Sequence, residues 1–132
     1  MQQEGLPVVI LCGGLGTRLR EETEFKPKPM VGIGERPLLW HLMTHYASFG
    51  NRRFVLCLGY KGEVIKDFFY RYDVMNSDLT VDLGQRSVEI HATRAEDWRV
   101  TLADTGMHAG TGARIKRGAR YVEGPTFFAT YG

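Results

Sequence analysis

The 132-residue sequence predicts an α/β fold in which helices flank a mostly parallel sheet. Two observations favour it. Short, uninterrupted apolar runs, which are typical of strands buried on both faces, alternate with segments whose apolar residues recur every three or four positions. The connections between these segments are short, and such βαβα alternation predicts parallel strands.

The first half of the chain supplies two strand–helix pairs. Strands are expected over residues 6–12 and 54–58, because both are continuous apolar runs rich in β-branched or large side chains. Pro37 is expected to open the first helix, and Gly50 to end it. A second helix, with its apolar face formed within residues 64–72, follows the second strand.

The second half departs from this alternation. Strands are expected over residues 79–83, 88–92 and 100–103, joined by polar turns with no helix between them. A last helix over residues 111–122 and a last strand over 126–131 then follow. We expect one nucleotide-binding domain over residues 1–132, incomplete at its C-terminus, because the chain stops where strands of such sheets carry ligand sites.

Composition excludes several classes of protein. Hydrophobic residues make up 43% and charged residues 24%, so intrinsic disorder is excluded. A net charge of +2 argues against a dedicated nucleic-acid binder. No apolar stretch approaches the roughly 20 residues of a membrane span. Cys12 and Cys57 lie inside apolar runs and are expected to be buried thiols, which favours a cytoplasmic location.

The most informative segment is residues 11–19, Leu-Cys-Gly-Gly-Leu-Gly-Thr-Arg-Leu. A glycine-rich turn after a buried strand can aim successive backbone amides at one phosphate group. Arg18 can add a bidentate grip on phosphate oxygens, and Lys26 and Lys28 follow in a proline-stiffened stretch. Taken singly, the glycines also fit a plain turn and the lysines a solvated loop. Their joint occurrence favours a phosphate site.

The sequence does not match the consensus motifs of two other phosphate-binding loops. A Walker loop requires Gly-x4-Gly-Lys-Ser/Thr, which the sequence lacks. A dinucleotide fingerprint starting at Gly14 would require Gly or Ala where Leu19 stands.

Several motifs together resemble the glucose-1-phosphate cytidylyltransferases, a branch of the sugar-phosphate nucleotidyltransferases. They are residues 11–19, 21–23 (Glu-Glu-Thr), 26–30 (Lys-Pro-Lys-Pro-Met), 40–43 (Trp-His-Leu-Met), 59–62 (Gly-Tyr-Lys-Gly), 97–102 (Asp-Trp-Arg-Val-Thr-Leu), 104–106 (Asp-Thr-Gly) and 111–117 (Thr-Gly-Ala-Arg-Ile-Lys-Arg). The resemblance implies a Rossmann-like sheet of the nucleotide-diphospho-sugar transferase type. It also implies a reaction of CTP with glucose 1-phosphate that yields CDP-glucose and pyrophosphate, and a homo-oligomer.

The resemblance also implies roles for individual residues. Arg18 and Lys28 would be catalytic. The residues that would bind the nucleotide are Leu11, Gly13, Gly14, Gly16, Thr17, Arg18, Lys26, Thr111, Gly112 and Arg114. Other interpretations assign Thr111 to a helix cap, Lys116 and Arg117 to a solvated helix face, and Trp40 and Trp98 to the core.

Two departures from the family pattern bear on activity. Ala113 stands where the family usually has a second glycine. The family continues after Tyr-Gly with an Asp that holds Mg²⁺, whereas Gly132 is the last residue here. We therefore expect the chain to be the N-terminal part of a longer catalytic domain and to be inactive alone. Uridylyl or thymidylyl transfer, and a non-catalytic nucleotide-binding module, remain alternatives.

Overall fold

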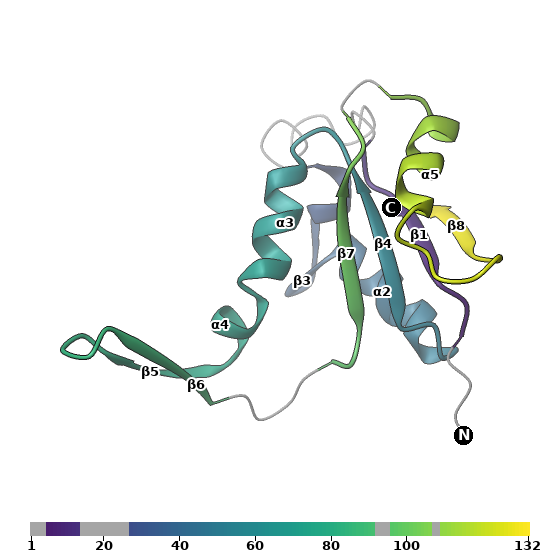
Figure 1. Ribbon diagram of the computed structural model, residues 1–132. Helices are drawn as coiled ribbons and strands as arrows, with labels where there is room; N and C mark the ends of the chain where they lie inside the picture. The colour runs from purple at the N-terminus through teal and green to yellow at the C-terminus, as the bar shows by residue number, and fades with distance from the viewer. Residues whose placement is uncertain (1–4, 14–26, 92–95, 107–108) are drawn as a thin grey trace.

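The central element is a four-stranded sheet in which every pairing is parallel (Figure 1). The computed structural model describes residues 5–13, 27–91, 96–106 and 109–132. The strand order is β7-β4-β1-β8. The strands are β1 (Val8–Leu11), β4 (Arg53–Leu58), β7 (Arg99–Asp104) and β8 (Phe128–Tyr131). The predicted α/β class is confirmed.

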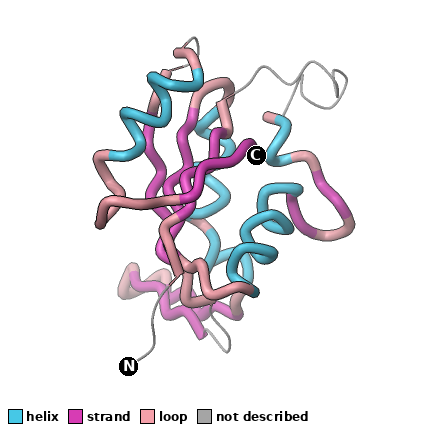
Figure 2. Tube along the Cα trace, turned by 90° about the vertical axis from the view of Figure 1, so that its right-hand side faces the viewer, coloured by secondary structure: helices cyan, strands magenta, loops and turns pink. Residues whose placement is uncertain are grey.

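Helices cover both faces of this sheet, as Figures 1 and 2 show. On one face, α2 (Leu38–Ser48) and α3 (Gly62–Tyr70) bury Leu39, Met43 and Ile65 against Val8 and Ile10 of β1. On the other face, α5 (Thr111–Ala119) and the segment after it pack against the alternate side chains of the same strands. Successive side chains of a strand point to opposite faces, so the uninterrupted apolar runs serve two core layers at once.

The first helix begins one residue later than predicted. Pro37 stands at the N-cap of α2 and also forms the end of a two-residue strand, β3 (Arg36–Pro37), which pairs antiparallel with β2 (Gly32–Ile33). Its extended ψ of 154° explains the shift, because that backbone conformation is not helical. Gly50 ends the helix as predicted, with a φ of +89° that favours glycine.

The second predicted helix is divided in two. It consists of α3 and a short α4 (Tyr72–Asn76), and Arg71 lies between them with a ψ of 6°. Arg71 Nε also donates to Asp67 Oδ1 at 2.6 Å across the last turn of α3. The apolar periodicity runs through this joint, so sequence pattern alone does not detect it.

The predicted strands of the middle region form, but two of them lie outside the main sheet. β5 (Asp78–Asp82) and β6 (Ser87–His91) make an antiparallel hairpin that projects away from the helices and sheet (Figure 1). All ten of their residues are exposed, and apolar side chains such as Val81 and Val88 are 54% and 59% exposed.

Within the described ranges, the structure contains no helix long and apolar enough to cross a membrane.

Candidate functional site

Three turns meet at the carboxyl edge of the sheet, where open α/β sheets carry their ligand sites. They follow β1 at Gly13, β4 at Gly59 and β7 at Gly106. Thr105, which is fully buried, ties two of them together: its backbone N and its Oγ1 both donate to the carbonyl oxygen of Leu58, each at 2.9 Å.

The three glycines bring these turns into backbone contact. A Cβ on Gly59 would lie 3.0 Å from the Cα of Gly13 and 3.0 Å from the carbonyl oxygen of Gly106. Gly106 also has a φ of +91°, which strains any other L-residue. Sequence reasoning assigned no role to Gly59 or Gly106. The available signals were the position of Gly59 directly after β4 and the place of both glycines in motifs of the family resemblance.

Arg114 lies beneath this contact, in the first turn of α5. It is 6% exposed, and its Nε donates to the carbonyl oxygen of Ala109 at 2.7 Å. A Cβ on Gly13 would lie 1.1 Å from Arg114 Nη1, so the guanidinium packs directly against the glycine backbone. Arg114 was predicted to contact the nucleotide. In this structure it packs against Gly13, a residue of the turn that was predicted to bind the phosphates.

The N-terminus of α5 lies beside the same edge, because Arg114 belongs to its first turn. The N-cap is Gly110, so the interpretation of Thr111 as the cap is wrong; Thr111 is the first helical residue. Thr111 and Gly112 are both exposed, and a Cβ on Gly112 would meet no atom of the described residues within 4 Å. The first amides of a helix have no intrahelical partner and carry the positive end of its dipole, which suits an anion.

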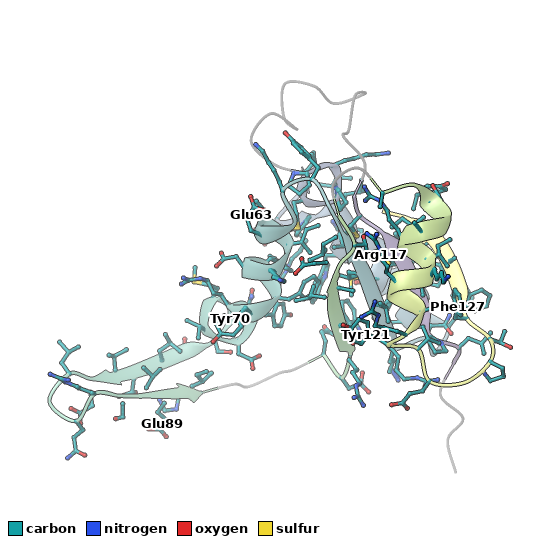
Figure 3. The ribbon with its side chains drawn as sticks, turned by 45° about the horizontal axis from the view of Figure 1, so that its top comes forward. Glu63, Tyr70, Glu89, Arg117, Tyr121 and Phe127 are labelled. Carbon is teal, nitrogen blue, oxygen red and sulfur yellow. The ribbon has the colours of Figure 1, made fainter. Side chains whose placement is uncertain are left out.

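Arg117 has a structural contact that the sequence analysis did not expect. Its Nη1 donates to the carbonyl oxygen of Thr105 at 2.5 Å, and in Figure 3 the side chain lies between α5 and β7. Lys116 and Arg117 are both exposed, in line with the interpretation of a solvated helix face, and Arg117 makes this contact in addition.

Lys28 opens a short 3-10 helix, η2 (Lys28–Met30), next to the end of β1. Pro29 and Met30 are buried and Lys28 is half-buried. A Cβ on Gly132 would lie 3.3 Å from both Pro29 Cγ and Cys12 Sγ, so this segment adjoins the ends of β1 and β8. The proline-stiffened stretch therefore keeps the backbone of Lys28 near the end of β1.

The remaining predicted site residues divide into two groups. Leu11 is the last residue of β1, 8% exposed, and its carbonyl oxygen accepts from the backbone N of Gly132 at 2.9 Å. The others lie outside the described residues: Gly14, Gly16, Thr17, Arg18 and Lys26.

The two cysteines are free and buried, as predicted. Burial raises the pKa of the Cys12 thiol far above its usual range, and burial also raises the pKa of Cys57. Both thiols therefore stay protonated, which argues against a nucleophilic role because the thiolate is the reactive form.

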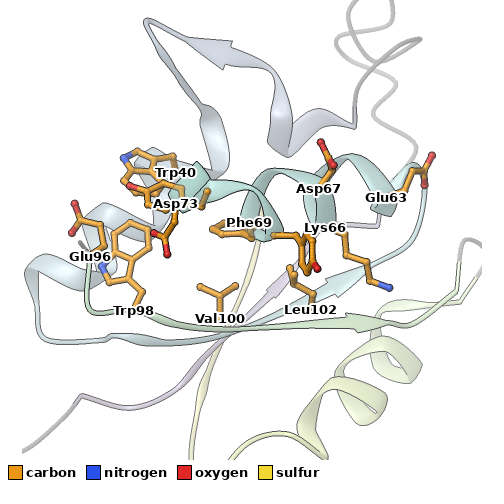
Figure 4. A pocket seen from close by; sticks show the side chains of 12 residues that line it. Trp40, Glu63, Lys66, Asp67, Phe69, Asp73, Glu96, Trp98, Val100 and Leu102 are labelled. Atoms are coloured by element: carbon orange, nitrogen blue, oxygen red, sulfur yellow. The ribbon is translucent and has the colours of Figure 1, made fainter. Parts of the chain in front are cut away.

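A groove of about 840 Å³ lies away from the glycine turns, between α3 and the outer side of β7 (Figure 4). Trp40 and Trp98 close one end with ring centroids 4.5 Å apart, and Lys66 lies towards the other, paired with Asp104 at 2.7 Å. The two tryptophans are half-buried and contact other aromatic rings, in line with their predicted packing role.

Among the described residues, metal-ligating side chains do not gather at the carboxyl edge of the sheet. Among the residues that the structure describes, no group of three or more His, Cys, Asp or Glu side chains could hold a metal ion. The described residues therefore do not by themselves fit a Mg²⁺ site.

Comparison with known proteins identifies the family. The nucleotidyl transferase family matches residues 7–103. Glucose-1-phosphate cytidylyltransferase of Salmonella typhimurium is 51% identical over 128 residues, which are 96% of this chain and 50% of that protein. The probable glucose-1-phosphate cytidylyltransferase of Bacillus subtilis is 42% identical over 127 residues, again 96% of this chain and 50% of that protein.

A solved structure agrees with the fold. HddC from Yersinia pseudotuberculosis, crystallised with GMP-PN, superposes with a TM-score of 0.67 at 29% identity, over 96% of this chain and 47% of its own. The chain thus spans about half the length of the relatives it matches. With the family match over residues 7–103 and 51% identity to a curated relative, the chain belongs to the nucleotidyl transferase family.

Proposed function

We propose that the protein containing this chain is a glucose-1-phosphate cytidylyltransferase, which makes CDP-glucose and pyrophosphate from CTP and glucose 1-phosphate. The observation that carries the proposal is the 51% identity to the Salmonella typhimurium enzyme of that name across 96% of the chain. The product would serve deoxysugar and surface-polysaccharide synthesis.

The chemistry asks the protein to hold two anions together. A phosphate oxygen of glucose 1-phosphate attacks the α-phosphorus of CTP, the bond from that phosphorus to the β-phosphate oxygen breaks, and pyrophosphate leaves with the electron pair. Positioning and charge neutralisation therefore provide most of the catalysis. The convergence of three turns and a helix N-terminus at one sheet edge supports this role.

We assign parts of this task to residues on that edge. The amides of the Gly13 turn, with Gly14, Gly16 and Thr17, would bind the CTP phosphates. Arg18 and Lys28 would neutralise charge at the reacting phosphates, with Lys26 in support. Leu11 and the N-terminal residues of α5, Thr111 and Gly112, would border the nucleoside. The environment of Gly112 supports this. Glycine in a helix costs about 1 kcal/mol relative to alanine, and no described residue lies close enough to require a glycine there.

Mg²⁺ belongs to the proposal through the family resemblance, because the residues that the structure describes do not form a site for it. When bound, it would supply charge neutralisation at the phosphates. The resemblance implies an Asp as its main ligand, and we derive no step through a metal ion from the residues present.

Uridylyl or thymidylyl transfer to the same sugar phosphate is the second candidate. Ala113, which is exposed at the start of α5, supports it. An added methyl group at the place where the family usually has glycine changes how closely a base can approach the backbone.

The test uses the full-length protein with glucose 1-phosphate and CTP, UTP or dTTP in parallel. Pyrophosphate release and chromatography of the nucleotide sugar measure turnover. We expect the highest kcat/KM with CTP. Higher kcat/KM with UTP or dTTP would replace the base assignment. Nucleotide binding without any nucleotide sugar would favour a non-catalytic module.

We further propose a cytoplasmic, homo-oligomeric enzyme. The buried free thiols suit a reducing compartment. The apolar side chains exposed on the β5–β6 hairpin support association with another copy, since an isolated two-stranded hairpin is only marginally stable in water. Light scattering of the full-length protein tests the oligomeric state, and a monomer would contradict it.

A further inference from the structure

Arg114 is a buried cation in a place where the rest of the helix turn is exposed. It is 6% exposed, whereas Thr111 and Gly112, in the same turn, are exposed. Arginine is almost never buried this deeply unless specific contacts hold it. Those contacts connect α5 with the turns after β1 and β4.

The guanidinium occupies the space beside two glycines. A Cβ on Gly13 would lie 1.1 Å from Arg114 Nη1 and 2.3 Å from its Cζ, and a Cβ on Gly59 would lie 2.7 Å from the same Nη1. One planar group therefore packs against the backbones of two turns that are 46 residues apart in sequence. Neither turn can move towards α5 without displacing the guanidinium.

Further contacts fix the other parts of Arg114. Its Nε donates to the carbonyl oxygen of Ala109 at 2.7 Å, and its own carbonyl oxygen accepts from Cys57 Sγ at 3.5 Å. Swinging the guanidinium outward to reach a nucleobase would break the bond to Ala109 and empty the space beside Gly13. A lysine could not substitute, because one nitrogen cannot both bond Ala109 and pack against the two glycines.

We propose that Arg114 is a positioning residue for the triphosphate. Its guanidinium packs against the Gly13 backbone and so fixes the described end of the β1 segment beside the proposed phosphate site, and it adds a positive charge there. Arg114 acts through Gly13 and does not read the base. This inference rests on the proposed nucleotidyl transfer, and it implies the same effect on every nucleoside triphosphate.

The experiment compares Arg114→Ala and Arg114→Lys with a control, Arg120→Ala, in the full-length protein. Arg120 follows α5 directly and is exposed. We expect Arg114→Ala to raise the KM for CTP and for UTP by the same factor, at least about tenfold, which equals 1.4 kcal/mol of binding free energy. The KM for glucose 1-phosphate and the kcat should change much less. Arg114→Lys should lose most of the same affinity, and free guanidinium ion should partly restore only the Ala variant.

Several outcomes would overturn the proposal. A change of about tenfold or more in the CTP:UTP preference, with unchanged affinity for inorganic tripolyphosphate, would make Arg114 a base-reading residue. A lowered melting temperature with unchanged KM values would leave it a purely structural role. If Arg114→Ala does not fold, Arg114→Lys decides between these outcomes.

Failure of the proposed function gives a different result. If the wild-type protein makes no nucleotide sugar, the proposed function fails. Calorimetric binding of inorganic tripolyphosphate to the wild type and to Arg114→Lys still tests the positioning role, and equal affinities would refute it.

Discussion

Gly118 sets how closely α5 approaches the sheet, and replacing it should lift the helix. A Cβ at this position would lie 2.5 Å from Cys57 Sγ, well inside the 3.4 Å at which ordinary contact begins. Overpacking of a core costs about 1–3 kcal/mol, against about 1 kcal/mol gained when alanine replaces glycine in a helix. We therefore expect Gly118→Ala to destabilise the full-length protein by up to about 2 kcal/mol.

The partner substitution gives this prediction its sharpest test. Cys57→Ala removes the sulfur that the new methyl group meets, so Gly118→Ala should be neutral or stabilising in that background. Urea unfolding of the four proteins in the double-mutant cycle measures the coupling, expected at about 2 kcal/mol. Gly112→Ala, on the same helix and with no described residue within 4 Å of the new Cβ, is the control for helix propensity. Equal effects of Gly118→Ala in both backgrounds would refute the close-packing argument.

Three more predictions concern activity and pH. Gly112→Ala should stabilise the protein by about 0.4–1 kcal/mol yet raise the KM for CTP, because its methyl group would enter the space assigned to the nucleoside; an unchanged KM in steady-state kinetics would remove Gly112 from the site. Lys28→Met should lower kcat by about 100-fold with an unchanged circular-dichroism spectrum; wild-type kcat would contradict its catalytic role. The thiol pKa values of Cys12 and Cys57 are raised in the folded state, so the unfolded chain loses these protons first, near the ordinary pKa of 9.0. Their contribution to stability is therefore full below about pH 9 and is lost as the pH rises above it. Between pH 7 and 10, the urea midpoint of unfolding should fall less steeply with pH in a Cys12→Ala, Cys57→Ala variant than in the wild type. Equal slopes in the two proteins would refute the claim that thiol ionisation causes the loss of stability.

The buried strands were the most predictable part of the fold. The apolar runs that include β1 and β4 are continuous, so a strand buried on both faces was the natural interpretation. The β5–β6 hairpin was predictable only as two strands. Alternating side chains such as Leu79 and Val81 indicate a strand with one apolar face, but they do not say which surface, if any, covers that face.

The candidate site was predictable to a lesser degree. The glycine turn after β1 was predicted as a phosphate site because its composition is unusual, and from Gly14 onward it lies outside the described residues. The packing of Arg114 against Gly13 was not predicted, because this contact joins residues that are 101 positions apart in the sequence. In addition, an arginine can serve either as a ligand-binding residue or as a structural contact, and the residue type does not distinguish the two. Arg117 shows the same difficulty, since a helix-surface pattern does not reveal that a neighbouring turn offers a carbonyl oxygen.

The position of β1 between β4 and β8 has a consequence for biosynthesis. Residue Leu11 pairs with Cys57 on one side and with Tyr131 on the other. The first partner leaves the ribosome early, whereas the second is synthesised 120 residues after Leu11, roughly 10 s later at typical elongation rates. During that interval the nascent chain carries a fully apolar strand with one open hydrogen-bonding edge, which is the kind of edge that chaperones shield from aggregation.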